Sequence, residues 1–108
     1  MISVLMLAYN HEAYIRQAIE NVLNQEIDVP MELIIGEDFS TDNTLAICEE
    51  YADSYPDKVV LISRDNNVGL GNNFVDIFNR ARGEYIALCE GDDFWTKPTK
   101  LQEQHLLM

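Results

Sequence analysis

The sequence predicts an α/β fold in which a mostly parallel, Rossmann-like sheet is covered by helices on both faces. Four short apolar runs alternate with three segments of helical period, and the connections between them are short. This alternation favours right-handed crossovers between parallel strands. Because 108 residues suffice for one compact core and are too few for two, residues 1–108 are expected to form a single domain.

The expected strands are short runs dominated by apolar residues, as is typical of strands buried on both faces of a sheet. They are Ile2–Ala8, Leu33–Gly36, Val59–Ser63 and Tyr85–Cys89. Ligands bind outside the carboxyl ends of the strands in such sheets. Function is therefore expected in Ala8–His11, Glu37–Ser40 and Glu90–Trp95.

Three segments between the strands carry apolar residues at helical spacing. They are Glu12–Asn24, Thr44–Tyr55 and Asn73–Arg82. Ser40 or Thr41 is expected to cap the second helix, because a hydroxyl there can accept a hydrogen bond from an amide of the first turn. Gly83 is expected in the C-cap position of the third helix.

The charge balance limits the partners. There are 19 acidic and 7 basic residues, for a formal net charge of -12. Such a surface repels phosphate backbones and anionic lipids, so no nucleic-acid partner is expected. An anionic ligand would need a local countercharge such as a bound cation.

The cysteines and the apolar segments point to the cytoplasm. Cys48 and Cys89 have neither CxxC spacing nor nearby histidines, which favours reduced core thiols. No apolar stretch reaches the length of a membrane-spanning helix, and the N-terminus lacks a basic segment before an apolar one. A cytoplasmic location is therefore expected. For a longer form of the protein, this expectation includes the inner face of the membrane.

The strongest local signal is the acidic string Glu90-Gly91-Asp92-Asp93, which follows the fourth strand. Each close pair of these carboxylates repels by up to about 4 kcal/mol at a separation of about 4 Å. A hard divalent cation bound through oxygen ligands would offset this repulsion. The alternative is a solvated acidic turn in which Asp93 or Thr96 caps a helix.

Two further strand ends carry candidate ligand contacts. Asp38 can accept a hydrogen bond from a base or a ribose hydroxyl, and the alternative there is simple helix capping. After the first strand the GxGxxG turn of dinucleotide-binding domains is absent. Tyr9 can stack on a nucleobase, or it is a core tyrosine with a satisfied hydroxyl. His11 is interpreted as a surface or capping residue, with a base or a ligand as the alternative. Asn67, Gly69 and Gly71 are interpreted as parts of a turn, with a ligand contact as the alternative.

Five sequence blocks then follow one another in a fixed order. They are Ser3–Asn10, Ile35–Thr44, Asn67–Gly69, Ala81–Ile86 and Glu90–Trp95. Together they resemble the N-terminal half of family 2 glycosyltransferases, which have the GT-A fold. The resemblance implies metal-assisted transfer, with inversion, from a nucleotide-diphosphate sugar, with UDP as the expected nucleotide. It implies a glycan or lipid-linked acceptor and a role in cell envelope polysaccharide biosynthesis.

The resemblance also implies roles for single residues. Ala8 and Tyr9 would lie at the nucleotide, with Tyr9 and Asp38 contacting the uracil or other base. Asp92 would lie near the ribose, and Asp93 would ligate a Mn2+ or Mg2+ that bridges the diphosphate. Inversion also needs a carboxylate base. In the family this base lies well C-terminal to the acidic pair, so no catalytic base is named.

The chain departs from the family pattern at three places. Leu7 replaces a proline or threonine, and Glu90 replaces the first aspartate of the acidic string. Asn73–Val75 stands where many members have Ala-Arg-Asn, so a phosphate-side contact from that arginine is not expected.

Two other function classes compete with the transferase. A phosphoacceptor receiver domain would have an acidic pair after the first strand, where this chain has Tyr9–His11. A non-catalytic nucleotide-binding or interaction module of the same fold is the second alternative.

The C-terminal segment Pro98–Met108 is amphipathic and ends in three apolar residues. This ending resembles a truncation boundary, with the acceptor-binding part absent. The chain alone is therefore expected to transfer little sugar, and pairing into a homodimer through the uncovered apolar surface is a further expectation.

Overall fold

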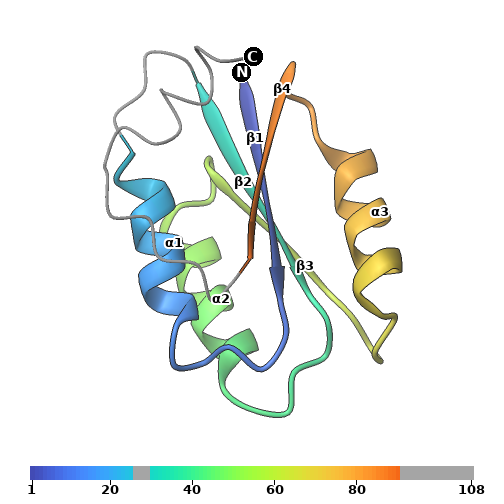
Figure 1. Ribbon diagram of the computed structural model, residues 1–108. Helices are drawn as coiled ribbons and strands as arrows, with labels where there is room; N and C mark the ends of the chain where they lie inside the picture. Colours follow the sequence, from blue (N-terminus) through green and yellow to red (C-terminus); the bar gives the residue numbers. More distant parts are fainter. Residues whose placement is uncertain (26–29, 91–108) are drawn as a thin grey trace.

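The computed structural model describes residues 1–25 and 30–90 and has the expected α/β architecture (Figure 1). In chain order the elements are β1 (Ile2–Ala8), α1 (Ile15–Leu23), β2 (Met31–Glu37), α2 (Thr44–Ser54), β3 (Val59–Ser63), α3 (Leu70–Arg80) and β4 (Tyr85–Glu90). All four predicted strands and all three predicted helices are therefore present. None of the helices in these residues is both long enough and apolar enough to span a membrane.

The four strands form one parallel sheet in the order β3-β2-β1-β4. Ala8 pairs with Glu37, and Glu37 pairs with Ser63, so the carboxyl ends of three strands lie at one edge. On the other side of β1, Leu7 pairs with Glu90. The chain turns back across the sheet between β3 and β4, which places the topological switch point at the ends of β1 and β4.

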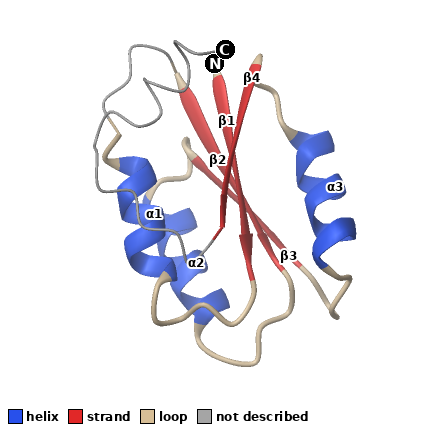
Figure 2. Cartoon of the chain, in the orientation of Figure 1, coloured by secondary structure: helices blue, strands red, loops and turns tan. Residues whose placement is uncertain are grey.

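Helices α1 and α2 cover one face of the sheet, and α3 covers the other (Figures 1 and 2). Alternate residues of β1 serve the two faces, because successive side chains in a strand point in opposite directions. Val4 and Met6 belong to the larger core under α1 and α2. Leu5 and Leu7 pack with Ile77 of α3 in the smaller core.

β2 begins at Met31, two residues before the predicted start at Leu33. The start was predicted too late because Glu32 is polar, yet this residue is buried in the strand and only 2% exposed. Its Oε2 accepts hydrogen bonds from the Ser3 hydroxyl at 2.6 Å and from the Arg82 backbone amide at 2.8 Å. Oε1 pairs with the Arg82 guanidinium at 3.0 Å. Burial alone would raise the pKa of Glu32, but these donors hold it below its ordinary value.

The predicted capping residues of α2 and α3 were wrong. Asp42 acts at the start of α2, where its Oδ1 accepts hydrogen bonds from the backbone amide and the hydroxyl of Thr44 at 2.9 and 2.6 Å. α3 ends at Arg80, three residues before Gly83. Gly83 instead packs against the start of β1, where a Cβ atom would lie 2.7 Å from the Met1 carbonyl oxygen. The close packing of two backbones, not a helix end, requires this glycine.

The prediction of a core thiol holds for Cys48, which is buried in α2 with no disulfide partner. Burial raises the pKa of this thiol to about 12, and the negative charges of Glu37 and Glu49 act in the same direction. Cys48 is therefore a packing residue that stays protonated at neutral pH.

Candidate functional site

A cavity of about 250 Å³ lies at the carboxyl edge of the sheet, between the end of β1 and the first turn of α3. It is lined by Leu7, Ala8, Tyr9, His11, Asp38, Leu70 and Asn73. Ala8, Tyr9 and Asp38, three of the predicted site residues, therefore share one cavity. This is the edge at which parallel α/β sheets bind their ligands.

Tyr9 is one of the residues that line this cavity. Its side chain is 43% exposed, which excludes the core tyrosine considered above. The exposed ring offers an apolar face to a planar ligand that enters the cavity. Behind it, Ala8 is buried and its carbonyl accepts a hydrogen bond of 3.0 Å from the Asp38 backbone amide. This bond keeps the two strand ends together beyond the regular ladder.

Asp38 is 7% exposed and faces the loop that precedes α3. Its Oδ1 accepts a hydrogen bond from the Val68 amide at 2.7 Å, and its Oδ2 accepts one from the Gly69 amide at 3.1 Å. Asn67 donates its side-chain amide to the Asp38 carbonyl. Each carboxylate oxygen has two acceptor sites, so each keeps one for a ligand donor. The neighbouring Glu37 serves a different purpose, because its buried carboxylate accepts a hydrogen bond from Ser40 N at 2.7 Å.

The loops that follow β1 and β2 are hydrogen-bonded to each other beside the cavity. Asn10 has a left-handed backbone with φ 54°, which asparagine tolerates better than most residues. Its Oδ1 accepts a hydrogen bond from Thr41 N at 2.8 Å, and its backbone N–H donates one to the Ser40 hydroxyl at 2.9 Å. Ser40 and Thr41, predicted as helix caps, therefore join the two loops.

His11 contributes to the cavity and to the start of α1. Its carbonyl accepts hydrogen bonds from the amides of Tyr14 and Ile15 at 2.9 and 2.8 Å. The predicted capping role was wrong, because Tyr14 is the N-cap residue of α1 and no side chain caps this helix. Its own amide donates to the Thr44 hydroxyl at 2.8 Å. The side chain lines the cavity, which the sequence interpretation had not anticipated.

Leu70 and Asn73 were also missed as cavity residues. α3 begins at Leu70, three residues before its predicted start. Gly69, with φ 90°, lets the chain turn sharply into the helix. The turn predicted at Asn67 and Gly69 leads directly into this helix, but the prediction that Gly71 also belongs to the turn was wrong, because Gly71 lies in the first turn of α3. The first turn of α3 therefore forms one wall of the cavity.

The predicted metal ligand Asp93 and the predicted ribose contact Asp92 lie outside the described residues. Among residues 1–25 and 30–90, no group of three His, Cys, Asp or Glu side chains could hold a metal ion. β4 ends at Glu90, whose backbone pairs with the cavity-lining Leu7. The acidic string therefore begins beside the cavity.

The sequence model of Glycosyl transferase family 2 matches residues 3–105. An uncharacterized protein from Mycobacterium tuberculosis is 48% identical over 102 residues, which cover 94% of this chain and 30% of that protein. The dTDP-rhamnosyl transferase RfbG of Shigella flexneri is 37% identical over 99 residues, covering 85% of this chain and 33% of RfbG. The chain thus matches only 30–33% of the length of these curated relatives.

Solved structures share the fold. A structure of S. aureus TarS in complex with UDP has a TM-score of 0.82 at 27% identity, covering 97% of this chain and 31% of that chain. Glucosyl-3-phosphoglycerate synthase from M. tuberculosis, crystallised with Mn2+ and UDP, has a TM-score of 0.68 at 25% identity, covering 91% and 36%. These similarities confirm the fold class that the five sequence blocks implied.

Proposed function

Because the chain belongs to glycosyl transferase family 2, we propose that it binds the donor of a glycosyltransferase that uses a nucleotide-diphosphate sugar. The observation that carries this proposal is the single cavity shared by Ala8, Tyr9 and Asp38 at the carboxyl edge of the sheet. Its position next to the switch point between β1 and β4 agrees with nucleotide sites in other α/β sheets.

The cavity suits a nucleobase. Leu7 and Leu70 give it apolar walls, and the half-exposed ring of Tyr9 can stack on a planar base. Asp38 has acceptor capacity left for a base N–H, which uracil provides. The UDP bound to TarS, a structural neighbour, supports uridine as the nucleoside. We therefore propose a UDP-sugar as donor.

A divalent cation completes the proposal. The formal net charge of -12 disfavours binding of a diphosphate without a metal ion. Asp93 would supply a carboxylate oxygen, the kind of ligand that Mn2+ or Mg2+ prefers, and Asp92 would lie near the ribose. Glu90, from which this string continues, has its backbone beside the cavity. A cation held by Asp93 would neutralise charge on the departing diphosphate. The Mn2+ found with UDP in glucosyl-3-phosphoglycerate synthase supports this choice of metal.

Transfer with inversion requires a carboxylate base on the acceptor side. The relatives are about three times as long as the matched region, so we propose that further sequence supplies this base and the acceptor site. A glycan or lipid-linked acceptor, in the synthesis of a cell envelope polysaccharide, is the proposed second substrate.

Thermal melts test the donor site. The 108-residue chain is heated alone, with UDP, with ADP, with UDP plus Mn2+, and with acetyl phosphate. A ligand at 100 times its dissociation constant stabilises the native state by about 2.7 kcal/mol, so a rise in Tm is expected with UDP and a larger one with UDP plus Mn2+. Equal responses to ADP and UDP would contradict the uridine site. A response to acetyl phosphate alone would instead support a receiver domain.

A further inference from the structure

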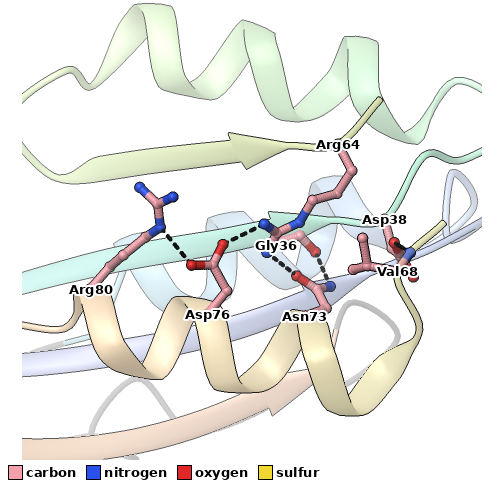
Figure 3. A network of polar contacts seen from close by, with 7 residues as sticks. All are labelled: Gly36, Asp38, Arg64, Val68, Asn73, Asp76 and Arg80. Carbon is pink, nitrogen blue, oxygen red and sulfur yellow. Dashed lines mark hydrogen bonds and ion pairs between the residues drawn. The ribbon is translucent and has the colours of Figure 1, made fainter. Parts of the chain in front are cut away.

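The side chain of Asn73 is held on both sides in the wall of the cavity (Figure 3). Its Nδ2 donates a hydrogen bond of 2.9 Å to the Gly36 carbonyl of β2. Its Oδ1 accepts one of 2.7 Å from Nη2 of Arg64. Asn73 is 2% exposed, so neither polar atom has water as an alternative partner. The first bond attaches the first turn of α3 to the end of β2, directly before Glu37 and Asp38.

Arg64 follows the last residue of β3 and does not line the cavity. Its side chain is 13% exposed, and Nη1 pairs with Asp76, which also pairs with Arg80 (Figure 3). Asp76 lies one helical turn after Asn73. The planar guanidinium therefore holds two side chains of α3 at once, one with each terminal nitrogen, which a lysine ammonium cannot do in the same geometry.

We propose that Arg64 is a positioning residue for the nucleotide site. It fixes the amide of Asn73 in the orientation that bonds Gly36, and it thereby holds the first turn of α3, with Leu70, in the cavity wall. This role rests on the proposed function, because it assigns Arg64 to the binding of the same nucleotide.

Loss of Arg64 would act on the ligand through Asn73. A buried Oδ1 without a donor is unfavourable, so the amide would rotate toward water. Asn73 lines the cavity, which offers open space for this rotation. The rotated amide would occupy room that the base needs and would release the bond to Gly36. Asp76, in contrast, is not among the residues that line the cavity, and its side chain is 36% exposed.

Titration calorimetry with UDP in the presence of Mn2+ tests this role. Arg64→Met keeps the apolar stem and removes every donor, and it is expected to raise the Kd of UDP about tenfold, as for loss of one charged hydrogen bond. Arg64→Lys restores one donor group but cannot hold Asn73 and Asp76 in the same geometry, so its Kd is expected to lie about threefold above that of the wild type. Asp76→Asn is the matched control, because it removes the ion pair and leaves the bond between Arg64 and Asn73. Its Kd is expected within about twofold of the wild type.

Equal Kd values for the wild type and a folded Arg64→Met variant would overturn the role. Equal weakening in Arg64→Met and Asp76→Asn would also overturn it, since it would indicate a general loss of stability. If Arg64→Met does not fold by circular dichroism, Arg64→Lys decides, and a Kd identical to that of the wild type counts against the role. A wild-type chain that does not bind UDP would overturn the proposed function itself, and the role of Arg64 with it.

Discussion

The carboxylate of Asp38 accepts a hydrogen bond of 2.7 Å from the backbone amide of Val68, a residue 30 positions further along the chain. This contact, with the parallel one to Gly69, joins the end of β2 to the start of α3 across the candidate site. The shape of the cavity therefore depends on the same carboxylate that is proposed to meet the base.

Asp38→Asn is expected to weaken UDP binding about tenfold or more, because an asparagine has one acceptor oxygen for two loop amides and a ligand. The substituted NH2 group would face a backbone N–H that now lacks an acceptor. Calorimetric titration with UDP measures the change. Asn67→Ala is the control, since it removes only the bond to the Asp38 carbonyl. Unchanged UDP affinity in Asp38→Asn would exclude the carboxylate from the nucleotide site.

Gly36→Ala is expected to destabilise the fold by about 1–3 kcal/mol, as overpacking in a core usually does. An added Cβ would lie 2.2 Å from Oδ1 of Asn73, and that side chain cannot retreat because Arg64 and the Gly36 carbonyl hold it. Urea denaturation of both proteins gives the free energy of unfolding.

Gly71→Ala is the matched control for this substitution. A Cβ there meets nothing within 4 Å, and the residue lies inside α3. Alanine in a helix is favoured over glycine by up to about 1 kcal/mol. The control is therefore expected to be neutral or stabilising, and equal losses at both positions would contradict the packing explanation.

The strands could be predicted from the sequence because apolar runs report burial directly. The exact ends of the strands could not be predicted where a distant residue forms hydrogen bonds with a polar residue inside the sheet. In the sequence, Glu32 looks like a residue that precedes the strand. In the fold, Ser3 and Arg82, which are 29 and 50 positions away, donate hydrogen bonds to its carboxylate. The same reason applies to α3, whose first turn is fixed by Gly36 and Asp38 and not by its own propensities.

Some residues of the candidate site could likewise be predicted from the sequence, and others could not. Ala8, Tyr9 and Asp38 could be identified because they follow apolar strands, and parallel strands end at one edge. Arg64 and Asn73 could not be identified, because what marks them is their hydrogen bond to each other and the bond from Asn73 to the Gly36 carbonyl. No spacing in the sequence reports such a contact, and it appears only when β2, β3 and α3 are assembled.

Glu32→Gln is expected to reduce stability at pH 7 by about 1–3 kcal/mol, the usual effect of weakening hydrogen bonds to a buried charge. The pKa of Glu32 is lowered in the folded chain, so its stabilising contribution is present above its ordinary value of 4.5 and is lost as the pH falls below it. The difference between variant and wild type should shrink between pH 5 and pH 3 in urea denaturation. Glu49→Gln, at an exposed position on α2, is the control and should change stability by less than about 0.5 kcal/mol. A difference that stays constant with pH would contradict the assignment.

Asp93→Asn should abolish the Mn2+-dependent part of UDP binding and leave the fold intact, if Asp93 ligates the proposed cation. The substitution removes a charged oxygen ligand, and it also relieves repulsion from Glu90 and Asp92, so the chain without ligand should be as stable as the wild type or slightly more stable. The alternative, a helix-capping aspartate, predicts the opposite pattern. Stability without ligand would fall by about 1 kcal/mol, and the response to UDP and Mn2+ would not change. Melts of both proteins, with and without UDP and Mn2+, separate these outcomes. A ligand at 100 times its dissociation constant stabilises the native state by about 2.7 kcal/mol, so loss of this stabilisation is large enough to measure. An unaltered rise in Tm with UDP and Mn2+ in the variant would therefore exclude Asp93 as the metal ligand.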